Sequence, residues 1–180
     1  MRPLLTSLMI LILILILACP ALADHEKVQL GPYNVSFDMN TTAHYKVTKE
    51  EPSNGITYKG IPFVRFNLSI EGDEGFAFLV LTRYNESMVA DTNANMGIVQ
   101  DVLSTTGCEK PKLFRPSIDG KPGALGNCRF PSGNILVIAS YSPDETKQGG
   151  EYLAKSNVRI LSTFPWEITR DMLYTLDVKP

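Results

Sequence analysis

The chain has 180 residues, of which 44% are apolar and 20% charged, and its formal net charge is −2. This length and composition fit one globular domain with a hydrophobic core. The slight acidity argues against the basic stripe that nucleic-acid binding needs and against electrostatic docking on an anionic membrane. We therefore expect no nucleic-acid partner.

Residues 1–23 have the pattern of an export signal. Arg2 supplies a positive start, residues 8–18 form an unbroken apolar run, and Ala21 and Ala23 complete a small-x-small cleavage pattern. We expect a signal peptide that is cleaved after Ala23. The protein would then be secreted or lie at the extracellular face of the cell envelope.

Two other fates of this leader stay open. The uncharged stretch that follows Arg2 is long enough to remain as a membrane anchor, because about 20 helical residues span a bilayer. Cys19 lies in a stretch that resembles a bacterial lipobox and could carry a lipid. The membrane would be a partner only through such an uncleaved leader or a lipidated Cys19.

The first part of the exported chain predicts a short lead-in and one strand. Residues 24–31 are a polar lead-in, and residues 32–180 make a single domain. Apolar and polar residues alternate over residues 33–39, which predicts a strand. Residues 48–60 are rich in Pro, Gly, Asn and Glu and predict a loop, with a short extended piece at residues 56–58.

Residues 63–70 carry the strongest strand signal, because apolar and polar residues alternate along them. The polar face, which we expect to be exposed, carries Arg65, Asn67 and Ser69. After a turn at residues 71–75, residues 76–84 return as a strand that is apolar on both faces. Such a strand is expected in the centre of a sheet with cover on both sides.

The second half of the chain predicts helices around a three-stranded meander. A helix begins at Asp91 or Thr92 and ends at Gly107. The predicted meander strands are residues 113–118, 124–130 and 135–142. A second helix is expected over residues 150–164, and a short amphipathic helix runs from Ile168 to Leu176.

This order of elements predicts an α+β fold, with helices packed on the faces of an antiparallel sheet. The meander from Ile118 to Pro143, followed by the predicted helix that ends at Phe164, resembles the PsbP/Mog-type fold. In that fold an antiparallel sheet is sandwiched between helices. Its members are mostly accessory or binding proteins, which the resemblance implies for this chain as well, but no partner or metal site carries over.

The exported part of the chain has two cysteines, Cys108 and Cys128. In an oxidising compartment two thiols usually form one disulfide, which for a loop of this length stabilises a fold by roughly 3 kcal/mol. The alternative is two buried free thiols.

The chain also has four Asn-x-Ser/Thr sequons, at Asn34, Asn40, Asn67 and Asn85. They are glycosylation candidates at a cell surface, and unused sequons in a chain rich in Ser and Thr are the alternative.

No catalytic constellation is recognisable. Only His25 and His44 could serve as a histidine base, and the motifs of nucleophilic hydrolases, zinc proteases and phosphate-binding loops are missing from the sequence. We therefore predict no catalytic residue and no cofactor. The acidic turn of Glu71, Asp73 and Glu74 is the one weak candidate for a metal site, and a solvated hairpin tip is its ordinary explanation.

Aromatic residues in or beside loops are the remaining binding candidates: Tyr45, Tyr58, Phe63 and Trp166. Trp166 follows Pro165 and either completes the core or marks a binding surface.

These observations favour an exported, non-enzymatic binding or accessory domain whose partner is a protein or an envelope component. One alternative is a carboxylate-dependent extracellular hydrolase, which needs two carboxylates about 5–10 Å apart in a cleft. The other is a small-ligand carrier, which needs an apolar pocket of at least ~300 Å³.

Overall fold

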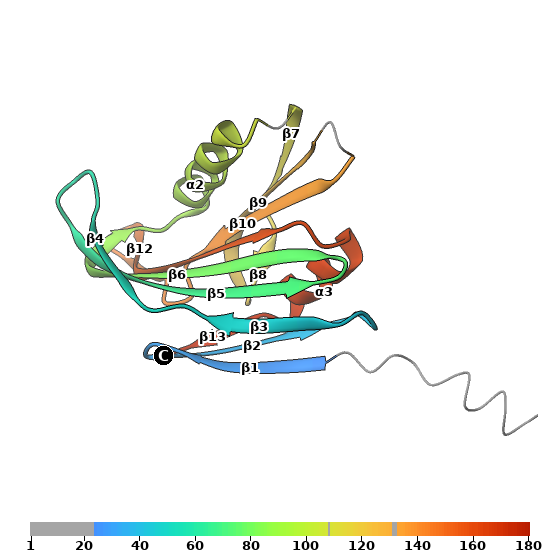
Figure 1. The fold of residues 1–180 in the computed structure, drawn as a ribbon. Coiled ribbons are helices and arrows are strands. Elements are labelled where there is room, and N and C mark those ends of the chain that lie inside the picture. Colours follow the sequence, from blue (N-terminus) through green and yellow to red (C-terminus); the bar gives the residue numbers. More distant parts are fainter. Residues whose placement is uncertain (1–23, 108, 131–132) are drawn as a thin grey trace, which may run out of the picture.

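The computed structural model describes residues 24–107, 109–130 and 133–180. The predicted leader, its Cys19, and Cys108 therefore lie outside the described residues. Within the described chain 59% of the residues are in strands and 16% in helices. The strands form a curled antiparallel half-barrel, seen from the side in Figure 1.

Seven strands follow one another across the large sheet. They are β3 (Tyr45–Lys49), β5 (Pro62–Gly72), β6 (Gly75–Val89), β7 (Glu109–Phe114), β9 (Lys121–Arg129), β10 (Ile135–Tyr141) and β12 (Glu151–Ser162). Their order in the sheet is β3-β5-β6-β12-β10-β9-β7. Three short strands pair with members of this sheet. They are β4 (Ser53–Ile56), which pairs with β5, β8 (Ser117–Ile118), which pairs with β9, and β11 (Thr146–Gln148), which pairs with β12.

A second, three-stranded sheet covers one face of the large sheet. It consists of β1 (Asp24–Leu30), β2 (Tyr33–Met39) and β13 (Asp177–Lys179), with β2 in the centre. Helix α3 (Trp166–Thr175) packs beside it against β2 and β10. The main core lies between these layers and includes the fully buried Phe37, Leu68 and Tyr141.

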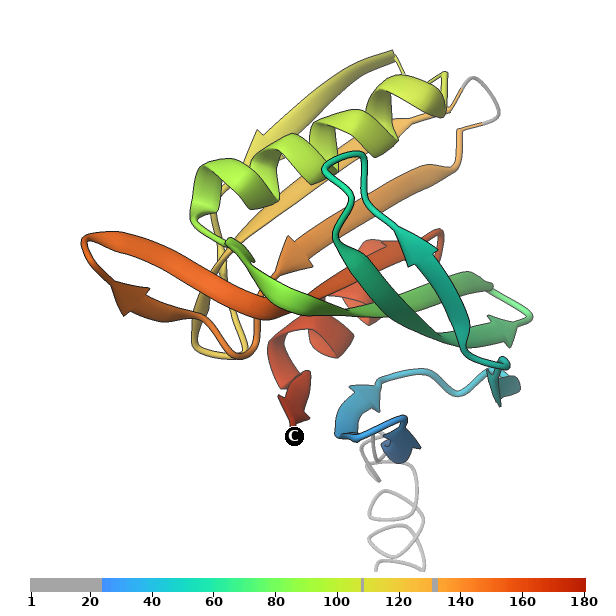
Figure 2. The ribbon, with the colours of Figure 1, turned by 90° about the vertical axis from the view of Figure 1, so that its left-hand side faces the viewer.

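Helix α2 (Thr92–Thr105) covers the opposite face of the large sheet over β9 and β10. Its Val99 and Leu103 pack on Ala124 and Ile138 in a second, smaller core. Figure 2 shows α2 and the β4–β5 hairpin on the same side of the large sheet. Neither helix of the described chain is long and apolar enough to cross a membrane.

Several elements predicted from the sequence are confirmed. The hairpin of residues 63–70 and 76–84 is formed by β5 and β6, and the meander is formed by β7 to β10. Helix α2 begins where it was expected, because the Asp91 carboxylate Oδ1 accepts the Ala94 N–H at 2.7 Å as an N-cap. The amphipathic C-terminal helix is α3.

The predicted fold class is wrong. The described chain is mostly β and has two helices, so it is a curled antiparallel half-barrel and not an α+β sandwich with its sheet between helical layers. The main reason is the segment predicted as a helix over residues 150–164. It forms the long strand β12, which pairs with β6 on one side and β10 on the other.

Two further segments differ from the expectation. The lead-in at residues 24–31 is strand β1, which pairs with β2 along its whole length. The loop predicted over residues 48–60 contains β4, which pairs with β5. The small sheet therefore occupies the side of the core where a helical layer was expected.

Candidate binding groove

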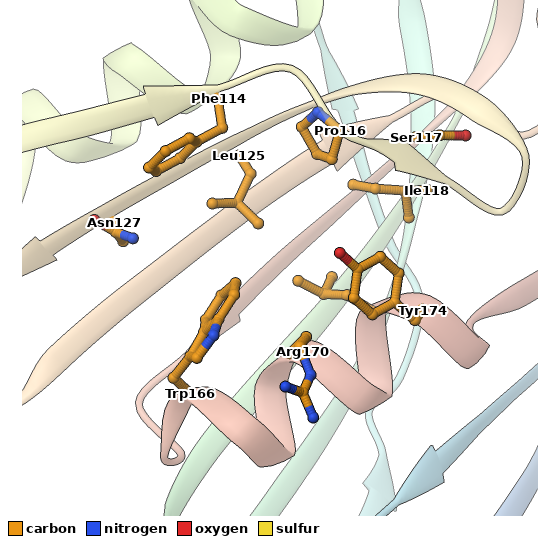
Figure 3. A pocket seen from close by; sticks show the side chains of 10 residues that line it. Phe114, Pro116, Ser117, Ile118, Leu125, Asn127, Trp166, Arg170 and Tyr174 are labelled. Carbon is orange, nitrogen blue, oxygen red and sulfur yellow. The ribbon is translucent and has the colours of Figure 1, made fainter.

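An apolar groove lies at the surface between α3 and the strands β7 to β9. Its volume is about 240 Å³. Figure 3 shows Trp166, Arg170 and Tyr174 on the helix side, facing Phe114, Pro116 and Ile118 on the strand side. Leu125 and Asn127 of β9 also line the groove. We call this site the α3 groove.

Helical periodicity explains the helix wall of the α3 groove. The helix wall begins with Trp166, and Arg170, Leu173 and Tyr174 follow it four, seven and eight positions later. At this spacing the four side chains share one face of the helix. Leu173 is buried, whereas Trp166 is 37% exposed and Tyr174 71% exposed. Leu173 therefore packs α3 against the core, whereas the rings of Trp166 and Tyr174 are partly exposed to solvent.

The opposite wall comes from the connection between β7 and β9. Phe114 ends β7, Pro116 immediately precedes β8, and Ile118 ends β8. Ile118 and Leu125 are buried, but Phe114 is 47% exposed. Exposed aromatic side chains that share a groove are typical of binding surfaces, where they supply large contact areas.

A second hollow continues from the α3 groove, because Phe114 and Asn127 line both. The charged residues that line it are all basic: Lys110, Lys112 and Arg129. We call it the basic hollow. In the described part of the chain neither Lys110 nor Lys112 forms an ion pair or a side-chain hydrogen bond.

Arg170 lies at the rim of the α3 groove and forms an ion pair with Asp171. Its Nε and Nη2 donate to Asp171 Oδ1 at 2.9 and 2.8 Å, and these bonds raise the pKa of Arg170. Asp171 Oδ2 accepts a further hydrogen bond from Asn40 at 2.9 Å. Hydrogen bonds from Asn40 and Arg170 hold the pKa of Asp171 below its usual value.

Strand β7 borders both hollows and is an edge strand of the large sheet. Its pairing with β9 shifts register between Glu109 and Lys112, and Lys110 has a positive φ of 45°. Pro111 lacks an N–H donor. A bulge, a proline and two lysines all oppose the addition of another strand, so we expect a partner to be bound by side-chain contacts.

The sequence-predicted acidic turn does not form a metal site among the described residues, where no group of three ligating side chains converges. Glu71 pairs with Phe76 in the ladder between β5 and β6. Glu74 Oε2 instead accepts a hydrogen bond from Thr41 Oγ1 at 2.6 Å.

The four sequon asparagines differ in their surroundings. Asn34, Asn40 and Asn85 are exposed. Asn67 is half-buried, and its Nδ2, the atom that would carry a sugar, donates to Glu50 Oε2 at 2.9 Å. The polar face that was expected to be exposed around Asn67 is instead half-buried at Arg65 and buried at Ser69.

The histidines and most aromatic candidates lie outside the α3 groove. His25 Nδ1 contacts Asp38 Oδ1 at 2.6 Å on the exposed β1–β2 pair. The Tyr45 hydroxyl donates to Glu26 Oε1 at 2.8 Å, and Tyr58 is 93% exposed at the tip of the β4–β5 hairpin. Of the four aromatic candidates only Trp166 lines the groove.

The groove residues that sequence reasoning missed include Phe114, Arg170 and Tyr174. Arg170 and Tyr174 had a usable signal, since both lie in the helix predicted from Ile168 to Leu176, four and eight positions after Trp166. Phe114 had none, because it becomes a groove residue only when β7 and α3 come together in the fold.

Of the two cysteines of the predicted disulfide, the structure describes Cys128. Cys128 lies in β9, where it is buried in the smaller core. Glu109 and Arg129, the chain neighbours of the two cysteines, are backbone partners in the ladder between β7 and β9. Since Cys108 lies outside the described residues, the Cys108–Cys128 pair stays a prediction.

A third hollow is relevant to the hydrolase alternative because three acidic residues, Asp91, Glu145 and Glu151, line it. Burial raises the pKa of Glu145, Lys121 lowers it and Asp91 raises it. The carboxylate of Asp91 is already engaged as the N-cap of α2. The structural role of Asp91 therefore accounts for one of the three carboxylates.

Comparison with protein-family models, curated proteins and solved structures finds no match to this chain. The family resemblance expected from the sequence therefore stays a prediction, and the function has to be argued from the site itself.

Proposed function

We propose that this protein is an exported binding domain that captures an acidic segment of another extracellular or envelope protein in the α3 groove. One observation carries the proposal: an apolar groove with exposed aromatic walls runs into a hollow whose charged lining residues are all basic. Charge complementarity then identifies the partner as a segment with one bulky apolar side chain and neighbouring carboxylates.

The dimensions of the groove support a side-chain anchor. Its volume of about 240 Å³ is below the ~300–1,000 Å³ of pockets that enclose whole small molecules. The groove is also shallow enough to leave Phe114, Trp166 and Tyr174 partly exposed. A leucine or aromatic side chain fits such a site, with the rest of the segment lying across the surface.

The experiment selects peptides from a random displayed library on the purified protein and titrates the enriched peptides. The chain has a single tryptophan, Trp166, so intrinsic fluorescence reports on the groove directly. We expect peptides that combine an apolar anchor with Asp or Glu, and a saturable change in Trp166 emission. Tyr174→Ser should weaken binding about 30-fold, as losing an aromatic hot spot of ~2 kcal/mol would.

Tyr58→Ser is the matched control, because Tyr58 is also an exposed tyrosine but lies on the β4–β5 hairpin. It should bind the peptides as the wild type does. Lys112→Gln should lower the affinity and reduce its salt dependence. Peptides without acidic residues, or equal loss in Tyr58→Ser and Tyr174→Ser, would contradict the proposal.

A further inference from the structure

A second site lies on the α2-facing side of the large sheet, away from the α3 groove. It adjoins a cleft of about 550 Å³ between α2 and the tip of the β4–β5 hairpin. Lining residues come from the hairpin, such as Thr57 and Ile61, and from α2, such as Ile98. Tyr84 of β6 and Asn157 of β12 also line it.

The strand register places two arginines beside this cleft. Arg65 pairs with Thr82, and Thr82 pairs with Asn157, so Arg65 lies in the same row as a cleft residue. Arg159 lies two positions after Asn157 in β12 and therefore points to the same face. Arg65 and Arg159 thus approach each other on this face across β6.

Neither arginine has a counter-charge. In the described chain neither guanidinium forms an ion pair or donates a hydrogen bond, and the Nε of Arg65 is buried without a partner. The nearby Glu50 carboxylate is engaged by the Asn67 amide at 2.9 Å. Burial lowers the pKa of Arg159, and repulsion from Arg65 lowers it further.

Two aromatic residues, Phe63 and Tyr84, accompany this pair. The Arg65 guanidinium lies 5.0 Å from the centroid of the Phe63 ring, and Phe63 meets Tyr84 edge-on at 6.2 Å. The Tyr84 phenol is close enough to both arginines that each lowers its pKa, although burial raises it overall. Three hydrogen-bond donors, two guanidinium groups and one phenol, therefore share one partly desolvated site.

Two unpaired cations at a desolvated site are unfavourable unless an anion joins them. Arginine is the residue best suited to bind such an anion, because the N–H groups of its planar guanidinium can donate two parallel hydrogen bonds to a carboxylate or a phosphate. We propose that this cleft binds a small organic anion, with its carboxylate or phosphate group between Arg65 and Arg159 and its organic part extending toward α2 and the hairpin.

The test measures thermal unfolding with acetate, citrate, phosphate or sulfate added at constant ionic strength, with chloride as the balancing salt. We expect a saturable rise in Tm with carboxylates or with phosphate and sulfate, and the preferred series identifies the head group. Arg159→Gln and Arg65→Gln should each weaken the effect about 10-fold or more, as the loss of a charged hydrogen bond would. Arg83→Gln is the matched control, because Arg83 is exposed on the other face of β6.

A purely structural arginine pair gives different results. Arg159→Gln without added anion should be at least as stable as the wild type, since it removes repulsion, whereas loss of a structural arginine would lower Tm. NMR of the arginine Nε–H groups of the wild type needs no variant, and anion titration should shift the Arg65 resonance. Stabilisation no greater than that by chloride, or equal in both Gln variants and wild type, would overturn the proposal.

Discussion

Asp119 joins three distant parts of the chain through one carboxylate oxygen. Its Oδ2 accepts the Val178 N–H of β13 at 3.2 Å and the Tyr141 hydroxyl of β10 at 3.3 Å. The residue has a positive φ of 52° in the turn between β8 and β9. Asp and Asn tolerate this conformation better than most residues do.

The pKa of Asp119 makes this contact pH-dependent. Burial raises the pKa of the carboxyl above its ordinary value of 3.8, against the hydrogen bond from Val178, which lowers it. The folded protein therefore binds this proton more tightly than the unfolded chain does. Its contribution to stability is fully present below about pH 4 and is lost as pH rises through the folded-state pKa.

We predict that Asp119→Asn unfolds at neutral pH with a free energy at least equal to that of the wild type. The neutral amide oxygen can accept both hydrogen bonds, and asparagine suits the positive φ. The measurement is urea unfolding at pH 4, 5.5 and 7, where the advantage of the variant should grow with pH. Asp119→Ala is the control and should lose about 1–3 kcal/mol because it leaves buried donors unpaired. Parallel pH profiles for wild type and Asp119→Asn would contradict this.

Buried polar residues show the limit of the sequence at this scale. Asn95, Ser140 and Asn157 are almost fully buried and bond one another, with Asn157 Nδ2 at 3.0 Å from Asn95 Oδ1. Each is polar, so the pattern of the sequence predicts exposure. Their burial is stabilised by hydrogen-bond partners that come together only where α2, β10 and β12 pack against one another.

At the scale of elements, β12 explains why the predicted fold class failed. Gly149 and Gly150 have φ values of 59° and 94°, and Gln148 pairs with Glu151 across them. This is a two-residue hairpin turn with positive φ at both positions, for which Gly-Gly is a recognised signal. The predicted helix begins at Gly150 instead, because the apolar residues that follow fit the period of a helix as well as that of a strand.

Elements with an independent local signal were predicted well. Helix α2 has a capping aspartate and a terminal glycine, and the β5–β6 hairpin has clear alternation before its Gly-containing turn. Strands β1 and β4 have few apolar residues, and each is held by a neighbour: β1 by β2 and β4 by β5. Their pairing comes from tertiary structure, which overrides weak local preference.

The packing of α2 on β9 yields a prediction about two glycines. A Cβ at Gly126 would lie 2.5 Å from Leu103 Cδ1 and 2.6 Å from Val99 Cγ1. Gly126→Ala should therefore cost about 1–3 kcal/mol by overpacking. Gly97→Ala, whose Cβ meets nothing within 4 Å on the same helix, should stabilise the protein by up to about 1 kcal/mol.

Urea unfolding of both variants measures these effects. Val99→Ala is a further check, because the space it opens should make Gly126→Ala less costly in the double variant than in the wild type. Equal effects of the two glycine substitutions would show that α2 does not approach β9 this closely.

At the scale of the whole molecule, the sequence predicts an exported chain that is cross-linked by one disulfide. If Cys108 and Cys128 are bonded, the double variant Cys108→Ser with Cys128→Ser should lose about 3 kcal/mol of unfolding free energy. Reduction of the wild type should have the same effect and should raise the intact mass by about 2 Da, the two thiol hydrogens. A mass that does not change on reduction would show two free thiols.

The candidate sites could not be predicted at this scale, although many of their residues were noticed. Trp166 was recognised as a possible surface residue, and Arg65 was placed on a polar face. The α3 groove needs β7 beside α3, and the anion site needs β5 beside β6 and β12. Both are consequences of sheet order, which local patterns in a sequence do not contain.

The small sheet has a consequence for when the molecule can fold. Its central strand β2 lies near the start of the described chain and its partner β13 at the end, and the Asp38 N–H donates to the Thr175 hydroxyl 137 residues later. Such distant pairings are slow to form, and they cannot form at all before β13 has been synthesised. The small sheet is therefore incomplete until β13 has been made, and the main core that it covers cannot close before β13 pairs with β2.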